Sequence, residues 1–337
     1  MEPRASALPW RRCIHLTLLL LHLSLPGGAA SCRILQCNSD FVAATLNLGS
    51  VEGSLDPCLY EQTPDGPEFL HCAVFGDPHV RTFSDDFQTC QVRGAWPLVD
   101  NDFLFIQATS TPCEGGGRST AITKISIIFK SWRQCVDQQL YQAELDNVPA
   151  AFADGSVWSG ERGGGQRGGG RPSLTVSSRL PGRHAEIRAE HIDSLLVVRQ
   201  SGRSLGVSLR SPRGVAFAFG PDQDLQLCVG GCPSSQRLAA PRPPHPVPPA
   251  TARAHCGELL PVRDVYFHAC VFDLLSGGDL NSSAAAAVGA LQDAAAMMPN
   301  PWRLHLLRGA VTHTPPPTLM LLLLGMLGTL STTLGHM

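Results

Sequence analysis

Short apolar runs, several of them alternating with polar residues, recur through the middle of the chain. They lie at residues 103–106, 122–129, 195–198, 205–209 and 215–219, and each is bounded by Gly, Pro, Ser or Asp. Runs of this length with such boundaries are typical of β-strands. Several short strands at this spacing predict an antiparallel sandwich or barrel. We therefore expect a mainly β fold from residue 75 to about residue 236.

Helical signals lie outside this region. Residues 41–46 predict one helical turn, and an alanine-rich stretch predicts a longer helix over about residues 284–297. Ser282 or Ser283 is expected to cap that helix, because a side-chain hydroxyl accepts hydrogen bonds from the first free N–H groups. Residues 256–275, which contain two cysteines, are interpreted as a disulfide-tied strand or hairpin.

Two low-complexity stretches interrupt the pattern, a Gly/Arg-rich one at 160–171 and a Pro-rich one at 240–250. Both compositions predict surface connections, because neither suits a central strand. The first stretch contains Gly163, Gly165 and Gly168 at the spacing of a dinucleotide-binding fingerprint. We attribute this match to composition, because the pattern predicts no strand before it and no helix after it.

Composition excludes several classes of protein. The chain has 337 residues and a formal net charge of -2, with 43% hydrophobic and 16% charged residues. These values rule out a collagen, a coiled coil and a fully disordered chain. They also argue against a nucleic-acid-binding protein, which needs a clustered excess of positive charge.

The first thirty residues have the features of a signal peptide. Arginines precede an apolar run at 14–25, and small residues follow at 28–30. A twelve-residue helix spans only about 18 Å, which is short of the roughly 30 Å of bilayer hydrocarbon that a membrane anchor must cross. We expect the mature chain to begin near Ser31. In a secreted chain, the sequon at Asn281 predicts an exposed N-glycosylation site.

The C-terminal end has the features of a glycosylphosphatidylinositol (GPI) anchor signal. The small pair Gly309 and Ala310 precedes a proline-containing spacer and a short apolar tail at 319–330. A tail-anchoring helix is the alternative, but the run is short and no basic residue follows it. We therefore expect a GPI-anchored ectodomain on the outer face of the cell membrane, attached through Gly309 or Ala310.

An exported chain is expected to form disulfide bonds. Loss of Cys13 with the signal peptide leaves eleven cysteines, an odd number. Cys113, in a turn-like stretch far from other cysteines, is our candidate for the odd one. The ten that we expect in bridges are Cys32, Cys37, Cys58, Cys72, Cys90, Cys135, Cys228, Cys232, Cys256 and Cys270. The pair at 228 and 232 also suggests zinc, but no second Cys/His pair has ligand spacing, so we predict no metal site.

The stretch Gly76-Asp77-Pro78-His79 carries the one chemical reaction that the sequence predicts. An aspartate before proline can attack its own carbonyl carbon and form a cyclic anhydride, with the proline nitrogen as the leaving group. Gly76 permits an unusual backbone angle, and His79 is near enough to donate a proton to that nitrogen. A β-turn with Pro at its second position is the alternative.

No other pattern predicts catalysis. The sequence contains no Gly-x-Ser-x-Gly, no His-Glu-x-x-His and no recognisable pair of catalytic carboxylates. We therefore expect no enzyme acting on other molecules and no cofactor. Asp85 and Asp86 suggest a calcium site, but two adjacent acids are more typical of a solvated turn, because calcium needs six or more oxygen ligands.

Several motifs resemble known proteins. The stretch from Gly76 to His79, followed by a strand, resembles the start of a von Willebrand factor type D domain. A longer set resembles the repulsive guidance molecule family: CRILQCN at 32–38, GAWPL at 94–98, IIFK at 127–130, YQAE at 141–144 and CVFD at 270–273. Two more, DNDFLF at 100–105 and QDLQLCVGGC at 223–232, most resemble the iron-regulating member of that family. The resemblance covers roughly residues 32–50 and 56–300.

The resemblance implies a type D-like antiparallel β-sandwich with a short disulfide-tied N-terminal segment and a C-terminal helix. It implies four parts of the chain. These are a signal peptide at 1–30, a shortened N-terminal segment at 31–72, the type D-like and family C-terminal domain at 73–300, and the spacer and anchor signal at 301–337.

The same resemblance implies partners. Members of this family are GPI-anchored co-receptors for bone morphogenetic proteins (BMPs) and ligands of neogenin, and the iron-regulating member raises hepcidin expression. The family cleaves itself at the Asp-Pro bond, here Asp77–Pro78. By resemblance, Cys58 and Cys72 are the candidates for bridges across the cut.

The chain departs from the family near its N-terminus. Only about twenty residues separate Cys37 from Cys58, whereas the family has a three-helix domain there, with an Arg-Gly-Asp motif, that grips the growth factor. We therefore expect neogenin binding to be better supported than BMP binding. The alternatives are a neogenin-binding surface protein that has lost direct BMP binding and an adhesive type D protein that multimerises through its odd cysteine.

Overall fold

A computed structural model describes residues 56, 58–60, 66–113, 120–162, 170–241, 243, 245–277, 279–298 and 300–307. The predicted signal peptide, the helical turn at 41–46 and the anchor signal lie outside the described residues, as do Cys32, Cys37, Gly309 and Ala310. Among the helices of the described ranges, none is both long and apolar enough to cross a membrane.

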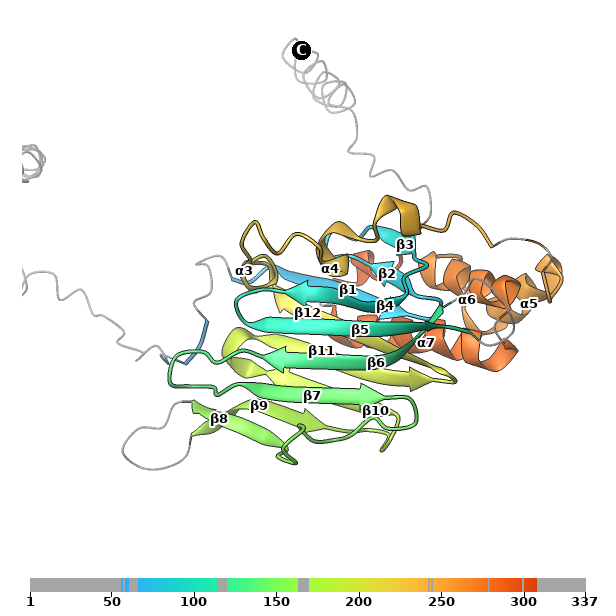
Figure 1. The fold of residues 1–337 in the computed structure, drawn as a ribbon. Helices are drawn as coiled ribbons and strands as arrows, with labels where there is room; N and C mark the ends of the chain where they lie inside the picture. Colours follow the sequence, from blue (N-terminus) through green and yellow to red (C-terminus); the bar gives the residue numbers. More distant parts are fainter. Residues whose placement is uncertain are drawn as a thin grey trace, which may run out of the picture. The chain divides into compact units, whose positions relative to one another are not determined.

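Two antiparallel sheets form the body of this part of the chain (Figure 1). The larger sheet contains, in spatial order, β3 (Phe87–Thr89), β2 (His79–Arg81), β1 (Phe69–Phe75), β12 (Ser204–Pro212), β11 (Ser194–Ser201), β10 (His184–Ala189), β9 (Arg171–Ser177) and β8 (Trp158–Arg162). The smaller sheet contains β4 (Gly94–Asp100), β5 (Leu104–Pro112), β6 (Thr120–Phe129) and β7 (Gln139–Glu144). The expectation of a mainly β fold is confirmed, and the predicted boundary between residues 72 and 73 falls within β1.

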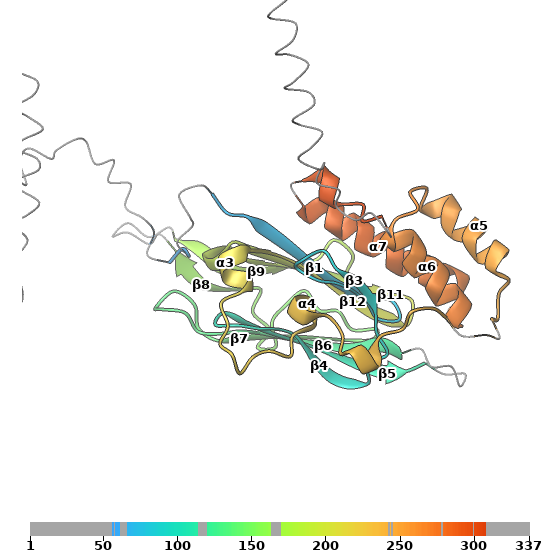
Figure 2. The same ribbon diagram turned by 90° about the horizontal axis from the view of Figure 1, so that it is seen from above.

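The helices follow the strands in sequence. They are α3 (Arg213–Ala216), α4 (Leu227–Gly230), α5 (Pro249–Leu259), α6 (Val265–Ser276) and α7 (Leu280–Met297). A short 3-10 turn at Glu190–Ile192 lies between β10 and β11, and two more lie at Ser234–Gln236 and Pro301–Arg303. Figure 2 shows the sheets as two layers, with α5, α6 and α7 on the side of the larger sheet that faces away from the smaller one.

Strand β1 contributes to both hydrophobic cores. Leu70, Cys72 and Val74 pack into the core between the sheets, whereas Ala73 and Phe75 pack against α5, α6 and α7. Successive side chains of a strand point to opposite faces, so a strand covered on both sides must be apolar throughout. The sequence of β1, Phe-Leu-His-Cys-Ala-Val-Phe, meets this requirement except at His71.

Two sequence predictions about strands are wrong. Residues 215–219 form the end of α3 and a turn, because Pro212 ends β12 and the N–H of Arg213 turns back to the carbonyl of Glu68. The stretch 256–275 forms α5 and α6 rather than a hairpin. Nearly every residue of α6 is buried, so its apolar run has no polar face that would reveal a helical period.

The cap of α7 also differs from the prediction. Its N-terminal cap is Asp279, whose carboxylate accepts hydrogen bonds from the N–H groups of Asn281 and Ser282. The helix therefore begins at Leu280, and Ser282 and Ser283 lie inside its first turn. Aspartate serves as well as serine at this position, because either oxygen satisfies the free N–H groups. The expectation of one C-terminal helix gives way to three, α5, α6 and α7.

The described residues contain four disulfides, of which all but the last join distant parts of the chain: Cys58–Cys135, Cys72–Cys228, Cys90–Cys232 and Cys256–Cys270. The first two connect residues before the Asp77–Pro78 bond with residues after it. The fourth ties α5 to α6. Cys113 is half-buried at the end of β5.

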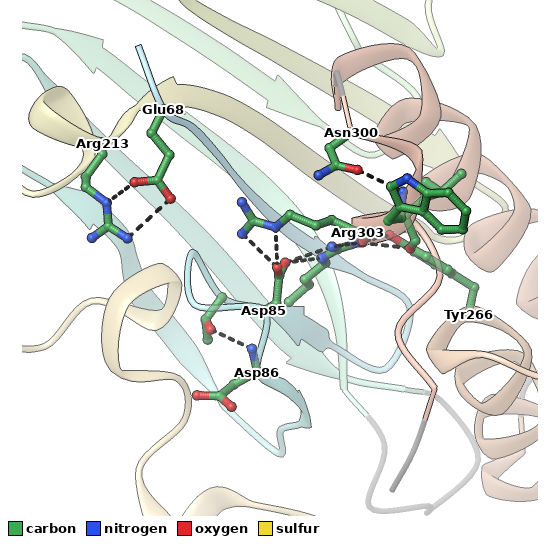
Figure 3. A network of polar contacts seen from close by, with 11 residues as sticks. Glu68, Asp85, Asp86, Arg213, Tyr266, Asn300 and Arg303 are labelled. Carbon is green, nitrogen blue, oxygen red and sulfur yellow. Dashed lines mark hydrogen bonds and ion pairs between the residues drawn. The ribbon is translucent and has the colours of Figure 1, made fainter. Parts of the chain in front are cut away.

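A network of polar contacts that includes Asp85, Tyr266 and Arg303 (Figure 3) fastens the segment after α7 to the larger sheet near β2. Arg81 is fully buried, and its guanidinium donates to Asp85 Oδ1 at 2.7 and 3.0 Å. It also donates to the hydroxyl of Tyr266 at 3.0 Å and to the main-chain carbonyls of Leu304 and Arg303. Each N–H group of the guanidinium therefore has an acceptor, and these hydrogen bonds offset the cost of burying the charge.

The acid at the centre of this network is Asp85, which the sequence suggested as half of a calcium pair. Its second oxygen accepts a hydrogen bond from Arg303 Nε at 2.8 Å. Two guanidinium groups thus occupy the carboxylate. A second contact fastens the same segment, because His305 Nδ1 lies 2.5 Å from Asp264 Oδ2 at the start of α6.

We predict that Arg81→Met lowers the free energy of unfolding by about 3 kcal/mol, because it removes one of the two guanidinium groups on Asp85 and leaves the Tyr266 hydroxyl and two main-chain carbonyls without their donor. Arg213→Met is the matched control. Arg213 pairs with Glu68, but the two side chains are 57% and 54% exposed, and such pairs contribute about 1 kcal/mol or less. Urea unfolding of both variants tests this prediction, and equal losses would contradict it.

Candidate functional site

The Asp77–Pro78 bond lies in the turn that joins β1 to β2. Phe75 and His79 are paired across the two strands, so residues 76–78 form the whole connection. The turn is held on both sides, since the Gly76 carbonyl accepts a hydrogen bond from Ser204 Oγ at 3.3 Å and the Pro78 carbonyl accepts one from the Cys90 N–H at 2.9 Å. Gly76 has a φ of 62°, in the left-handed region that favours glycine.

His79 is completely buried beside this turn. Its Nδ1 hydrogen-bonds with the hydroxyl of Thr89 at 2.9 Å, and its Nε2 hydrogen-bonds with Asp273 Oδ1 at 2.6 Å. The ring stacks on Phe87 at 5.8 Å between centroids, and the edge of Phe272 closes another side at 5.6 Å. Both nitrogens have partners and the ring is enclosed, so the orientation of the imidazole is fixed.

Asp273 comes from α6, and only 4% of its side chain is exposed. Besides contacting His79 through Oδ1, it places Oδ2 only 2.5 Å from the position that a Cβ atom on Gly76 would occupy. The carboxylate therefore lies directly against the backbone of the turn. Sequence reasoning missed this residue as part of the site, although a single acid in the otherwise apolar run of α6 was a usable signal.

The carboxyl group of Asp77 is in an environment that favours its neutral form. Its Oδ2 is buried and has no hydrogen-bond partner among the described residues. Burial, and then the nearby negative charge of Asp273, raise the pKa of Asp77 to about 9. At neutral pH this side chain therefore carries a proton.

A cavity of about 400 Å³ opens beside the bond. Asp77 and Asp273 lie on its wall, together with Thr111, Ser201 and Ser282. A volume of this size, with these polar groups on its wall, is large enough for several water molecules.

The remaining predicted site residues lie elsewhere. Asn281 is exposed in the first turn of α7, as a glycosylation site requires. Within the described ranges, no three His, Cys, Asp or Glu side chains are grouped so as to hold a metal ion. The geometry supports chemistry at the turn at 76–79 and at the acid that α6 brings to it.

Comparison with known proteins decides the family. Residues 68–299 match the model of the repulsive guidance molecule (RGM) C-terminal domain. The chain belongs to the repulsive guidance molecule family. The matched range begins one residue before β1 and ends two residues after α7, so the family domain includes both sheets and the three helices that cover them.

Individual relatives agree with this assignment. The chain is 50% identical to hemojuvelin of Homo sapiens over 258 residues, which cover 74% of this chain and 59% of the relative. It is 42% identical to repulsive guidance molecule A of Gallus gallus over 275 residues, which cover 74% of this chain and 62% of the relative. It is 38% identical to repulsive guidance molecule B of Homo sapiens over 327 residues, which cover 88% of this chain and 72% of the relative. The chain thus spans about three fifths of the hemojuvelins that it matches.

The described part contains four disulfides, and disulfides of this kind persist in oxidising, extracellular compartments. Together with the family, they indicate a protein of the secretory pathway.

We predict that Gly76→Ala destabilises the protein at least twice as much as Gly155→Ala. Both glycines have a positive φ, 62° and 86°, which costs an alanine about 1–2 kcal/mol. A Cβ at Gly155 meets nothing within 4 Å, whereas one at Gly76 meets Asp273 Oδ2 at 2.5 Å. Urea unfolding measures both losses, and equal losses would show that Asp273 does not press on the turn.

Proposed function

We propose that this protein is a GPI-anchored co-receptor of the BMP pathway that acts like hemojuvelin. In that role it regulates hepcidin expression and iron homeostasis and binds neogenin. The observation that carries the proposal is the 50% identity with hemojuvelin over 74% of the chain, compared with 42% and 38% for the two other relatives.

Neogenin binding is the better supported of the two interactions. The family's neogenin-binding part lies in the type D domain and the residues after it, and residues 68–299 match the family's C-terminal domain. The growth-factor-binding helices of the family have little sequence to correspond to them here, since about twenty residues separate Cys37 from Cys58. The second candidate function is therefore a neogenin-binding or adhesive surface protein without direct BMP binding.

We also propose that the chain cleaves itself once at Asp77–Pro78. A side-chain oxygen of Asp77 bonds to the Asp77 carbonyl carbon, and the bond from that carbon to the Pro78 nitrogen breaks. The proton of the neutral carboxyl passes to the nitrogen, which leaves a cyclic anhydride and a secondary amine. One water then opens the anhydride, and Asp77 ends with two carboxyl groups.

The source of the proton is the carboxyl of Asp77 itself. Sequence reasoning proposed His79, but both of its ring nitrogens are hydrogen-bonded, to Thr89 and Asp273. A pKa of about 9 keeps the Asp77 carboxyl protonated at neutral pH, and the neighbouring cavity supplies room for the water. The bonds Cys58–Cys135 and Cys72–Cys228 would keep the two pieces joined.

We predict that Asp77→Ala yields one band on a reducing gel, where the unaltered chain yields two fragments. The substitution removes the nucleophile and the proton together. Asp86→Ala, which removes another acid from the same part of the sheet, should leave both fragments. Two fragments of unchanged size from the Asp77 variant would contradict the proposed cleavage.

We predict that phosphatidylinositol-specific phospholipase C releases the protein from the surface of intact cells, because the enzyme cuts the anchor lipid. The released fraction is measured by immunoblotting of the medium. Complete retention on the cells would refute the GPI anchor.

We predict that the purified mature ectodomain, residues 31–309, binds immobilised neogenin, and that it binds a BMP more weakly than human hemojuvelin does. Surface-based binding with human hemojuvelin as the reference measures both interactions. Binding to neogenin alone would favour the second candidate function. Binding to neither would contradict the co-receptor and the neogenin-binding protein alike, and a ladder of disulfide-linked oligomers on a non-reducing gel would then favour adhesion.

A further inference from the structure

One buried acid contacts both sides of the segment that contains the Asp77–Pro78 bond. Asp273 Oδ1 lies 2.6 Å from His79 Nε2, on the C-terminal side of the bond. Asp273 Oδ2 lies against the Cα of Gly76, on the N-terminal side. Asp273 belongs to α6 and is 194 positions away from His79 in the sequence.

The surrounding contacts leave Asp273 little freedom. Its helix is tied to α5 by Cys256–Cys270 and is capped by Asp264, whose carboxylate accepts from the N–H groups of Tyr266 and Phe267. The next residue toward the N-terminus, Phe272, packs on the ring of His79. A carboxylate on a rigid helix can fix a turn within a few tenths of an ångström, which loop residues alone seldom do.

We propose that Asp273 is a positioning residue for the self-cleavage, holding His79 and Gly76 so that the turn between them keeps the carboxyl of Asp77 beside its own carbonyl carbon. This inference rests on the self-cleavage proposed above. In this account the cleavage depends on a residue of α6 as well as on the motif at residues 76–79.

Electrostatics gives Asp273 a second effect on the reaction. Three charged groups share the cavity wall with Asp77, namely Asp273 from α6, Arg203 and Asp279, and His79 from β2 is hydrogen-bonded to Asp273. Among them, Asp273 is the group whose charge raises the pKa of Asp77, after burial itself. The neutral acid reacts in the proposed step, so the rate should fall as pH rises through that pKa, and loss of the Asp273 charge should move this fall to lower pH.

Three variants of the full chain test the proposal. Asp273→Asn keeps the size of the side chain and removes its charge, Asp273→Ala removes the contacts as well, and Asp264→Asn is the control. Asp264 is a buried acid on the same helix, 1% exposed, that also pairs with His305 through Oδ2. Asparagine caps a helix equally well through its oxygen and can donate from its amide nitrogen to His305 Nδ1, so the substitution removes the charge and keeps the contacts. Pulse-labelled precursor is isolated from cells and incubated over a series of pH values, and the fragments are quantified on reducing gels.

The expected results separate a positioning role from a structural one. The pH at which the rate has fallen by half should move down by about one unit or more in Asp273→Asn. The rate should fall about ten- to a hundred-fold in Asp273→Ala. Because the cavity reaches Asp273, added formate should restore part of the rate in Asp273→Ala. Asp264→Asn should behave as the unaltered chain.

Two outcomes would overturn the proposal while leaving self-cleavage intact. One is cleavage of both Asp273 variants at the unaltered rate with an unaltered pH profile. The other is equal slowing of Asp264→Asn and Asp273→Ala with no effect of formate, which would assign Asp273 to folding alone. Failure of the unaltered precursor to cleave at any pH would instead refute the self-cleavage, and the role of Asp273 with it.

Discussion

The burial of β1 on both faces is the constraint on which the rest of this structure depends. One set of its side chains packs between the sheets and the alternate set packs under the helices, so this strand is part of both hydrophobic cores. Cys72 at its centre is bonded to Cys228, and its last residue, Phe75, packs on Tyr266 of α6 at 5.9 Å. The turn at Gly76 therefore begins from a point of the fold that is held by packing on both faces and by a disulfide.

The same constraint explains how a cut in this turn would leave the domain assembled. β1 stays hydrogen-bonded to β12 along six residue pairs and to β2 along three. Two disulfides link the segment before the bond to the segment after it. Cleavage would thus change the covalent connection between β1 and β2 without removing either strand from the sheet.

The sequence predicts those features that depend on residues close together in the chain. The strands at 122–129, 195–198 and 205–209 were predictable from their apolar patterns. Helix α6 was not predictable, because it is apolar on nearly all sides and shows no helical alternation of polar and apolar residues. The contact between Asp273 and His79 was also beyond prediction, since it exists only after the helices have packed on β1 and β2.

Intact-mass spectrometry of the purified mature ectodomain bears most directly on the proposal that this fold cleaves its own chain and holds the pieces together. Before reduction, the protein should have the mass of the uncut chain plus one water. After reduction it should separate into two chains, the second beginning at Pro78. A single chain of uncut mass after reduction would contradict the proposal.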